Sequence, residues 1–143
     1  MANVCTYLNF NGRTESAFEF YKAIFKTEYA GPIHRIKDIA QAPGQTRSEE
    51  QGNRIAHMAL PILGGHILRG TDVPEVRMGN NVSIMLEPDS REEAQALYDA
   101  LSEGGEVLMP LADMFWGAYF GELIDRFGVK WLVNVDHDNQ EVA

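Results

Sequence analysis

The sequence repeats one helical pattern at a constant spacing of 77 residues. The matching positions are Ala17, Phe20, Tyr21, Ala23 and Ile24 in the first half and Ala94, Leu97, Tyr98, Ala100 and Leu101 in the second. Both sets place apolar side chains at positions i, i+3, i+4 and i+7, the pattern of an amphipathic helix. We predict that Thr14 caps the first helix, that Ser90 and Glu93 form a capping box for the second, and that Gly104 and Gly105 end it.

The segments around each helix repeat at the same spacing. Residues 4–10 fall on 81–87, and residues 28–37 fall on 105–114. Two further predicted strands follow in each half, at 54–62 and 66–70 around a Gly64-Gly65 turn, and at 115–123 and 129–135 around residues 124–128. Each half therefore reads strand–helix–strand–strand–strand. This order predicts an α+β fold in which two βαβββ modules, at about 4–70 and 80–136, build one domain over residues 1–143 from curved mixed sheets.

One segment breaks the symmetry between the halves. Residues 40–53, AQAPGQTRSEEQGN, are polar, contain Pro and Gly, and have no counterpart in the second half. Such a composition is typical of an exposed loop, and a lid or a dimer contact are its candidate roles.

Composition excludes two classes of partner. The chain carries a net charge of -9, with 21 acidic and 12 scattered basic residues. Because nucleic acids and anionic membranes bind clustered Lys and Arg, we expect neither as a partner. The N-terminal sequence lacks a secretory signal, and no apolar run approaches the roughly 20 residues that span a bilayer, so we expect a cytoplasmic protein. A single Cys excludes an intrachain disulfide and a Cys-rich zinc site.

Three stretches resemble the PhnB-like (demethylubiquinone methyltransferase-like) branch of the vicinal oxygen chelate superfamily, which includes glyoxalase I, bleomycin-resistance proteins and extradiol dioxygenases. They are YLNFNGRTESAFEFYKAIF, IAHMALPILGGHILRGTD and FWGAYFGELIDRFGVKWLVN. The resemblance covers nearly the whole chain. It implies a glyoxalase-like fold, a cavity between two curved sheets that takes a small molecule, and a homodimer.

The same resemblance implies a divalent metal held by His, Gln or Glu from the first and last strands of each module. The sequence departs from this set. The corresponding positions carry Cys5, Thr6 or Tyr7, then Leu68 or a neighbour, then Asn80 or Asn81, and finally Leu132. We therefore expect no usual metal set, and a divalent metal would need other ligands, such as His57 or Cys5. The methyltransferase label is also unsupported, because no Gly-rich loop after a strand precedes an acid that could hold a cofactor ribose.

Strand alternation nominates five residues for a ligand pocket. They are Tyr7, Asn9, His57, Trp116 and Asn134. Tyr7 and Asn9 share a strand face, and Asn134 lies opposite an apolar face that contains Trp131, which we expect in the core. His57 is either a hydrogen-bonded structural residue or a pocket acid/base or metal ligand. Trp116 either packs in the interior or stacks on a planar ligand.

The remaining polar candidates have simpler interpretations. We expect inert packing for Cys5, exposure for His66, solvent exposure for Glu87, and a local salt bridge or turn hydrogen bond at Asp125. His34 and His137 have no supporting cluster in the sequence. No catalytic residue is identified.

Three functions are consistent with these observations, and the last of them is a structural or regulatory dimer whose pocket is vestigial. The first is a protein that binds a planar or aromatic small molecule in its cavity without the usual metal. The alternative is a metal-dependent lyase, isomerase or dioxygenase with non-standard ligands. The sequence leaves open whether the chain is an enzyme.

Overall fold

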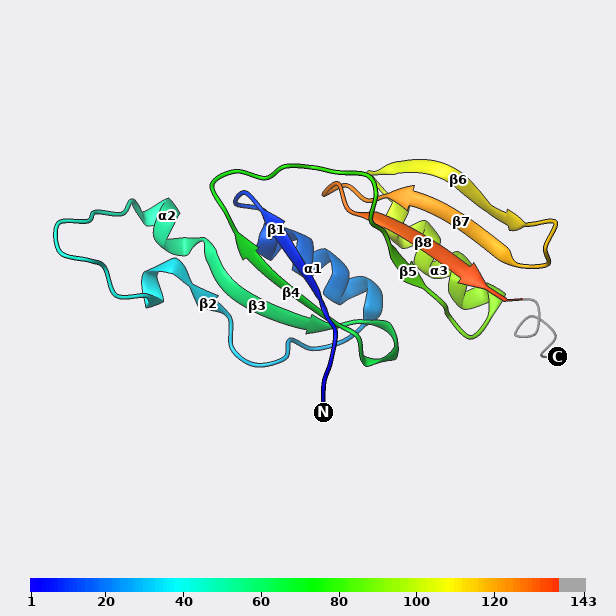
Figure 1. Cartoon of the computed structure of the whole chain (residues 1–143), viewed down its shortest axis with the longest axis horizontal. Coiled ribbons are helices and arrows are strands. Elements are labelled where there is room, and N and C mark those ends of the chain that lie inside the picture. The colour runs from blue at the N-terminus through cyan, green and yellow to red at the C-terminus, as the bar shows by residue number, and fades with distance from the viewer. Residues whose placement is uncertain (137–143) are drawn as a thin grey trace. The chain divides into compact units, whose positions relative to one another are not determined.

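The computed structural model describes residues 1–136, which form two compact units (Figure 1). The first unit is Met1–Arg77, and the second begins at Met78. Each unit contains a four-stranded mixed sheet and a 12-residue helix. The predicted α+β class and the two βαβββ modules are confirmed. His137, one of the four histidines of the sequence, lies outside the described residues.

The first unit places its last strand beside its first. Its elements are β1 (Thr6–Phe10), α1 (Thr14–Phe25), β2 (His34–Arg35), η1 (Ile36–Asp38), α2 (Glu49–Asn53), β3 (Ile55–Pro61), η2 (Leu63–Gly65) and β4 (Ile67–Asp72). The sheet order is β1-β4-β3-β2, with β1 parallel to β4 and the other pairs antiparallel. The positive φ angles of Gly64 and Gly65 form the predicted turn between β3 and β4.

The second unit repeats this topology. Its elements are β5 (Ile84–Leu86), α3 (Arg91–Ser102), β6 (Glu106–Asp113), β7 (Tyr119–Ile124) and β8 (Lys130–Val135). The order β5-β8-β7-β6 again pairs the first and last strands in parallel. The repeat that the sequence shows is therefore a repeat of structure.

Each long helix packs on its sheet above a glycine. In the first unit a Cβ added to Gly70 would lie 2.7 Å from the Phe18 ring of α1. In the second, a Cβ added to Gly121 would lie 2.8 Å from the Tyr98 ring of α3. Both aromatic side chains are buried, so a larger residue at either glycine would push the helix away from the sheet.

The two helices begin differently. Ser90 Oγ accepts a hydrogen bond from Glu93 N at 3.1 Å, as predicted, but the Glu93 carboxylate accepts from Asp89 N and does not close a capping box on Ser90. The predicted cap at Thr14 is wrong. Thr14 is the first helical residue, and Asp72 of β4 accepts from both its backbone N–H and its hydroxyl. A carboxylate distant in sequence thus caps α1.

Two predicted strands are shorter in the structure. Only His34–Arg35 of the segment 28–37 pairs with β3. In the segment 115–123 the strand begins at Tyr119, because Met114 and Gly117 form a turn in which Gly117 has a φ of 97°. Gly117 therefore provides a tight turn.

The spacing of 77 residues holds for the helices but not for the first strands. It would superpose Tyr7 on Ile84, yet Tyr7 and Met85 are the side chains that are half-exposed. The connection from β1 to α1 is one residue shorter than that from β5 to α3. Because strand side chains alternate, this one-residue difference means that first-strand residues 77 positions apart point to opposite faces of their sheets.

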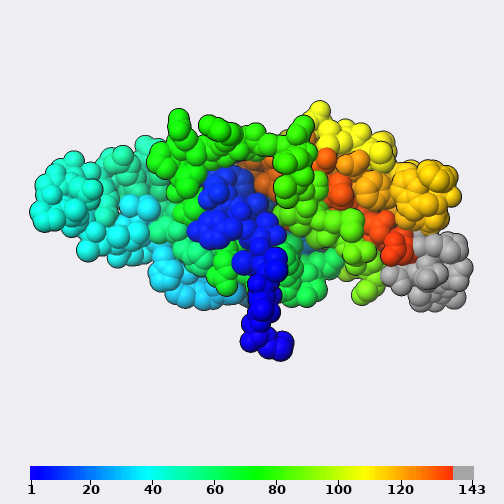
Figure 2. Space-filling model, in the orientation of Figure 1, coloured from blue at the N-terminus to red at the C-terminus, as the bar shows by residue number. Residues whose placement is uncertain are grey.

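The asymmetric segment 40–53 is not loop throughout. Its last five residues form α2, which Ser48 caps by accepting a hydrogen bond from Gln51 N. Figures 1 and 2 show the segment (cyan) projecting from the sheet of the first unit. The Arg47 guanidinium donates to the carbonyls of Ile36 and Ile39 and so anchors its base. A cavity of about 630 Å³, lined in part by Arg47, Arg54 and Asp72, lies beside it.

Across residues 1–136, no helix combines the length and apolar character needed to cross a membrane.

Candidate functional site

The sheet of the first unit has one face that α1 does not cover. The open face, as we name it, bears Tyr7, Asn9, His57, Arg69 and Thr71. In the parallel pairing of β1 with β4, Tyr7 lies opposite Arg69 and Asn9 lies opposite Thr71. The alternate residues of the same strands, such as Leu68 and Gly70, point toward α1 and are buried. Three of the five predicted pocket residues, Tyr7, Asn9 and His57, are therefore together.

His57 and Arg69 form a polar pair on this face. Arg69 Nη1 lies 3.4 Å from His57 Nε2. A guanidinium can only donate hydrogen bonds, so Nε2 of the imidazole must be the acceptor. The contact therefore requires an unprotonated Nε2 and leaves Nδ1–H as the donor of the neutral ring.

The surroundings of His57 keep its imidazole neutral. Burial lowers the pKa of His57 below its ordinary value of 6.5, and the positive charge of Arg69 and the neighbouring His34 lower it further. His34 is its cross-strand neighbour on β2, with ring centroids 6.5 Å apart, and the Tyr7 ring lies 6.3 Å away. At neutral pH the site thus carries a guanidinium, an uncharged imidazole and a phenol ring that is 49% exposed.

The positive charge of Arg69 is not neutralised locally. Among residues 1–136 its side chain has no carboxylate partner, whereas Arg35, Arg91 and Lys130 pair with Glu15, Asp113 and Glu122. Its partner in register on β3 is Ala59, which offers no polar side-chain atom. An unpaired guanidinium on a protein of net charge -9 is a local site for anions.

On the opposite face of the sheet, the Asp72 carboxylate links the strands by hydrogen bonds. Asp72 Oδ1 accepts from Gly12 N, Thr14 N and the Thr14 hydroxyl at 2.9, 3.1 and 2.7 Å. Its other oxygen accepts from Ile55 N at 2.9 Å. One carboxylate therefore connects the β1–α1 turn and the start of β3 to the end of β4. The strands β1, β3 and β4 carry the open face.

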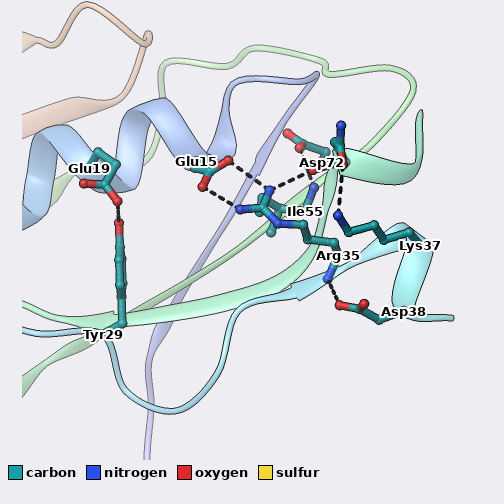
Figure 3. A network of polar contacts seen from close by, with 9 residues as sticks. Glu15, Glu19, Tyr29, Arg35, Lys37, Asp38, Ile55 and Asp72 are labelled. Carbon is teal, nitrogen blue, oxygen red and sulfur yellow. Dashed lines mark hydrogen bonds and ion pairs between the residues drawn. The ribbon is translucent and has the colours of Figure 1, made fainter. Parts of the chain in front are cut away.

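A second polar contact fixes β2 against α1. Figure 3 shows the Arg35 guanidinium and the Glu15 carboxylate facing each other in a two-point contact, with distances of 3.0 and 2.7 Å. This hydrogen bonding lowers the pKa of Glu15 below its ordinary value. The contact places β2, and with it His34, at the edge of the open face.

The strand positions at which the resemblance implies metal ligands do not fit a metal ion here. Leu68 is fully buried beneath α1, and the neighbour that points to the open face is Arg69, whose positive charge repels a divalent cation. In the second unit Leu132 of β8 lies opposite Met85 of β5, whereas the predicted Asn80 and Asn81 precede β5 and are exposed. Within residues 1–136 no three His, Cys, Asp or Glu side chains gather closely enough to hold a metal ion.

The other two predicted pocket residues belong to the second unit. Asn134 on β8 lies opposite Phe120 and donates a hydrogen bond to Asp136 at 2.9 Å. Trp116 lies in the turn before β7 and is 57% exposed, so interior packing, one of its two interpretations, is wrong. Its ring makes edge contacts with Phe115 and Phe120, at 4.9 and 6.4 Å between centroids. These three aromatic residues form a surface cluster.

Most of the remaining candidates match their sequence interpretations, and His66 differs. Trp131 is fully buried, as predicted, and its indole N–H donates to Asp125 Oδ2. The predicted turn hydrogen bonds at Asp125 are present, because its other oxygen accepts from Phe127 N and Val129 N. His66 is only partly exposed, and its Nε2 lies 2.8 Å from the Thr6 hydroxyl. Cys5 is half-buried, and Glu87 is exposed.

The sequence reasoning missed Arg69, Thr71 and His34. The signal for Arg69 was the alternation of HILRGTD, in which Leu68 and Gly70 pack under a helix and Arg69 must point away. His34 had no signal, because its neighbour His57 is distant in the sequence and the strand that brings it there has only two residues.

Comparison with known proteins decides the family. A family model described as 3-demethylubiquinone-9 3-methyltransferase matches residues 2–134. The chain belongs to this PhnB-like family. The PhnB-like chain is 26% identical to protein YjdN of Escherichia coli K12 over 137 residues, which cover 90% of this chain and 92% of YjdN.

Solved structures agree with this assignment. The chain is similar to protein PA1353 from Pseudomonas aeruginosa, with 33% identity, a TM-score of 0.80, and coverage of 95% of this chain and 98% of that one. A PhnB protein from Bacillus cereus, itself titled a putative 3-demethylubiquinone-9 3-methyltransferase, gives 25% identity, a TM-score of 0.74, and coverage of 94% and 99%. The fosfomycin resistance protein FosX from Listeria monocytogenes shares the fold, with a TM-score of 0.63, 12% identity, and coverage of 94% and 93%. The glyoxalase-like fold of the vicinal oxygen chelate superfamily is thereby established.

Proposed function

We propose that this PhnB-like protein binds a small planar molecule on the open face of its first unit, without a metal ion. The observation that carries the proposal is the Arg69–His57 pair beside the half-exposed Tyr7 ring. Three different recognition groups thus share the face of the first sheet that α1 does not cover. Small-molecule sites combine apolar surface with a few polar groups in this way.

Each side chain has a distinct part in such binding. The Tyr7 ring offers an apolar surface on which a planar ligand can stack. His57 offers its Nδ1–H as a donor, because its other nitrogen already accepts from Arg69. The exposed Asn9 amide, one position further along the same face, can both donate and accept. None of these roles requires a metal.

A titration of chelator-treated protein tests this proposal. Three one-ring compounds that differ in charge, benzoate, benzyl alcohol and benzylamine, would be added to ¹⁵N-labelled protein while backbone amide signals are followed. We expect at least one compound to give saturable shifts in β1, β3 and β4 that Tyr7→Ala weakens. Phe115→Ala, which removes an exposed aromatic ring from the second unit, is the matched control. No saturable shift in these strands with any of the three would refute the proposed site.

We further propose that the chain forms a homodimer through its second unit. The support is β6, an edge strand that exposes the apolar side chains Val107, Leu108 and Met109. Exposed apolar edge strands favour pairing with another chain. Light scattering should give twice the chain mass, and Leu108→Lys should reduce it. A monomeric wild-type protein would contradict this proposal and leave the binding proposal untouched.

A further inference from the structure

We propose that the ligand of the open face is a small aromatic acid, whose carboxylate or similar oxyanion binds Arg69 while its ring covers Tyr7. The inference rests on the proposed function and specifies the class of ligand.

Charge is the first argument. Arg69 is half-buried, and among residues 1–136 its only polar side-chain partner is the His57 nitrogen. A guanidinium fork matches a carboxylate in two-point geometry. His57 adds no negative charge that would compete with a bound acid, and its Nδ1–H adds a second donor. The face therefore favours an anion over a neutral or cationic compound.

Geometry is the second argument. Tyr7 and Arg69 are register partners on adjacent parallel strands, which lie about 4.8 Å apart. A ring stacked on Tyr7 thus has its substituent above the neighbouring strand, where Arg69 lies. A one-ring acid is long enough to use both groups at once.

The second unit provides an internal comparison. Its sheet also carries a cation beside an apolar surface, Lys130 near Leu132. There, however, Glu122 lies in register with Leu132 and pairs with Lys130 at 3.5 Å. Among residues 1–136, Lys130 of the second sheet is paired with a carboxylate, whereas Arg69 of the first sheet is not.

The test compares benzoate with benzyl alcohol, which has a similar size but no charge. Affinities would be measured by amide-shift titration for the wild type, Arg69→Gln and Lys130→Gln. The last variant changes the net charge equally but on the other sheet. We expect benzoate to bind the wild type at least about 10-fold more tightly than benzyl alcohol does, and Arg69→Gln to abolish that preference. Lys130→Gln should retain it.

Each outcome separates the two proposals. If both compounds bind equally tightly at β1, β3 and β4, the proposal of an aromatic acid is overturned, whereas the proposed binding site stands. If the preference for benzoate falls by a similar factor in Arg69→Gln and Lys130→Gln, it reflects the net charge of the protein. This result would also overturn the proposal of an aromatic acid bound by Arg69. If neither compound binds, the proposal of an aromatic acid is overturned. If benzylamine does not bind either, the proposed binding site is overturned as well. Should Arg69→Gln fail to fold, Arg69→Met, which also removes the charge but keeps an unbranched side chain, replaces it with the same expected result.

Discussion

Arg69 and His57, on the neighbouring strands β4 and β3, lie 3.4 Å apart through Nη1 and Nε2. Because the guanidinium cannot accept a hydrogen bond, this contact selects one neutral form of the imidazole. Among residues 1–136 the charge of Arg69 has no carboxylate partner, and the neutral ring does not supply a counter-ion. The same contact therefore sets the protonation of His57 and the anion preference of the face.

The pKa of His57 should lie below 6.5 and should rise when Arg69 is replaced by Gln. Burial is the larger cause of the depression and the Arg69 charge the next, so Arg69→Gln should shift the pKa only part of the way back. A ¹H NMR titration of the imidazole measures both values. Lys130→Gln serves as the control, and an unchanged pKa in Arg69→Gln would show that the two groups do not interact.

Stability should fall on the acid side more steeply with His57 than without it. The folded pKa is depressed, so the contribution of neutral His57 is fully present above the unfolded value near 6.5. It is lost as the pH falls through the folded value, because the folded state binds the proton less readily than the unfolded state does. Urea unfolding at pH 7.5 and pH 5 should show a larger loss for the wild type than for His57→Gln. An equal loss in both would contradict the cause assigned here.

Asp72→Asn should lower the free energy of unfolding by about 2 kcal/mol, the scale of a lost charged hydrogen bond combined with a lost helix cap. The carboxylate accepts four hydrogen bonds, whereas an amide would turn an NH₂ group toward some of the same donors. Urea denaturation measures the change. Glu28→Gln, which removes an exposed carboxylate paired with Lys22, is the control and should have no measurable effect. Similar values for the two variants would argue against the assigned role of Asp72.

Replacement of Trp131 should lower the stability of the protein, whereas replacement of Trp116 should not. Trp131→Phe removes a buried indole and its hydrogen bond to Asp125, which should cost about 2–3 kcal/mol of stability. Trp116→Phe changes an exposed ring and should leave stability unaltered, while removing the fluorescence that acrylamide quenches readily. Strong quenching that persists in Trp116→Phe would show that Trp131 is not enclosed.

The sequence predicted the fold through features that depend on local periodicity. The matching helices and the alternating strands locate the two modules, because apolar side chains must recur with the period of the element that they bury. Some predicted ends of helices and strands are wrong, because groups outside the repeating pattern determine where those elements begin. Thr14 looks like a cap, yet Asp72 from the end of β4 supplies the acceptor. Residues 115–118 read as strand, yet the turn at Gly117 removes them from the sheet.

The candidate site was predictable in part for the same reason. Alternation within one strand places Tyr7 with Asn9, but it does not show that His57 on another strand shares their face. The pairing of Tyr7 with Arg69 could not be predicted either, because register between distant strands is set by tertiary packing. The expected metal position was assigned to Leu68 or a neighbour. Alternation puts Leu68 and Arg69 on opposite faces, and the burial of Leu68 under α1 shows which of the two faces is open.

The most direct test of metal-free binding is the affinity of one compound in two states of the same protein. Tag-free protein would be stripped with a chelator, titrated with the tightest-binding of the three one-ring compounds, and titrated again after loading with Mn²⁺ or Zn²⁺ and desalting. The bound metal would be quantified by elemental analysis. We predict the same affinity and the same shifted amides in β1, β3 and β4 in both states, with no stoichiometric metal retained. Binding that appears only after loading, with about one metal ion per chain, would contradict this account and favour a metal-dependent lyase, isomerase or dioxygenase with non-standard ligands.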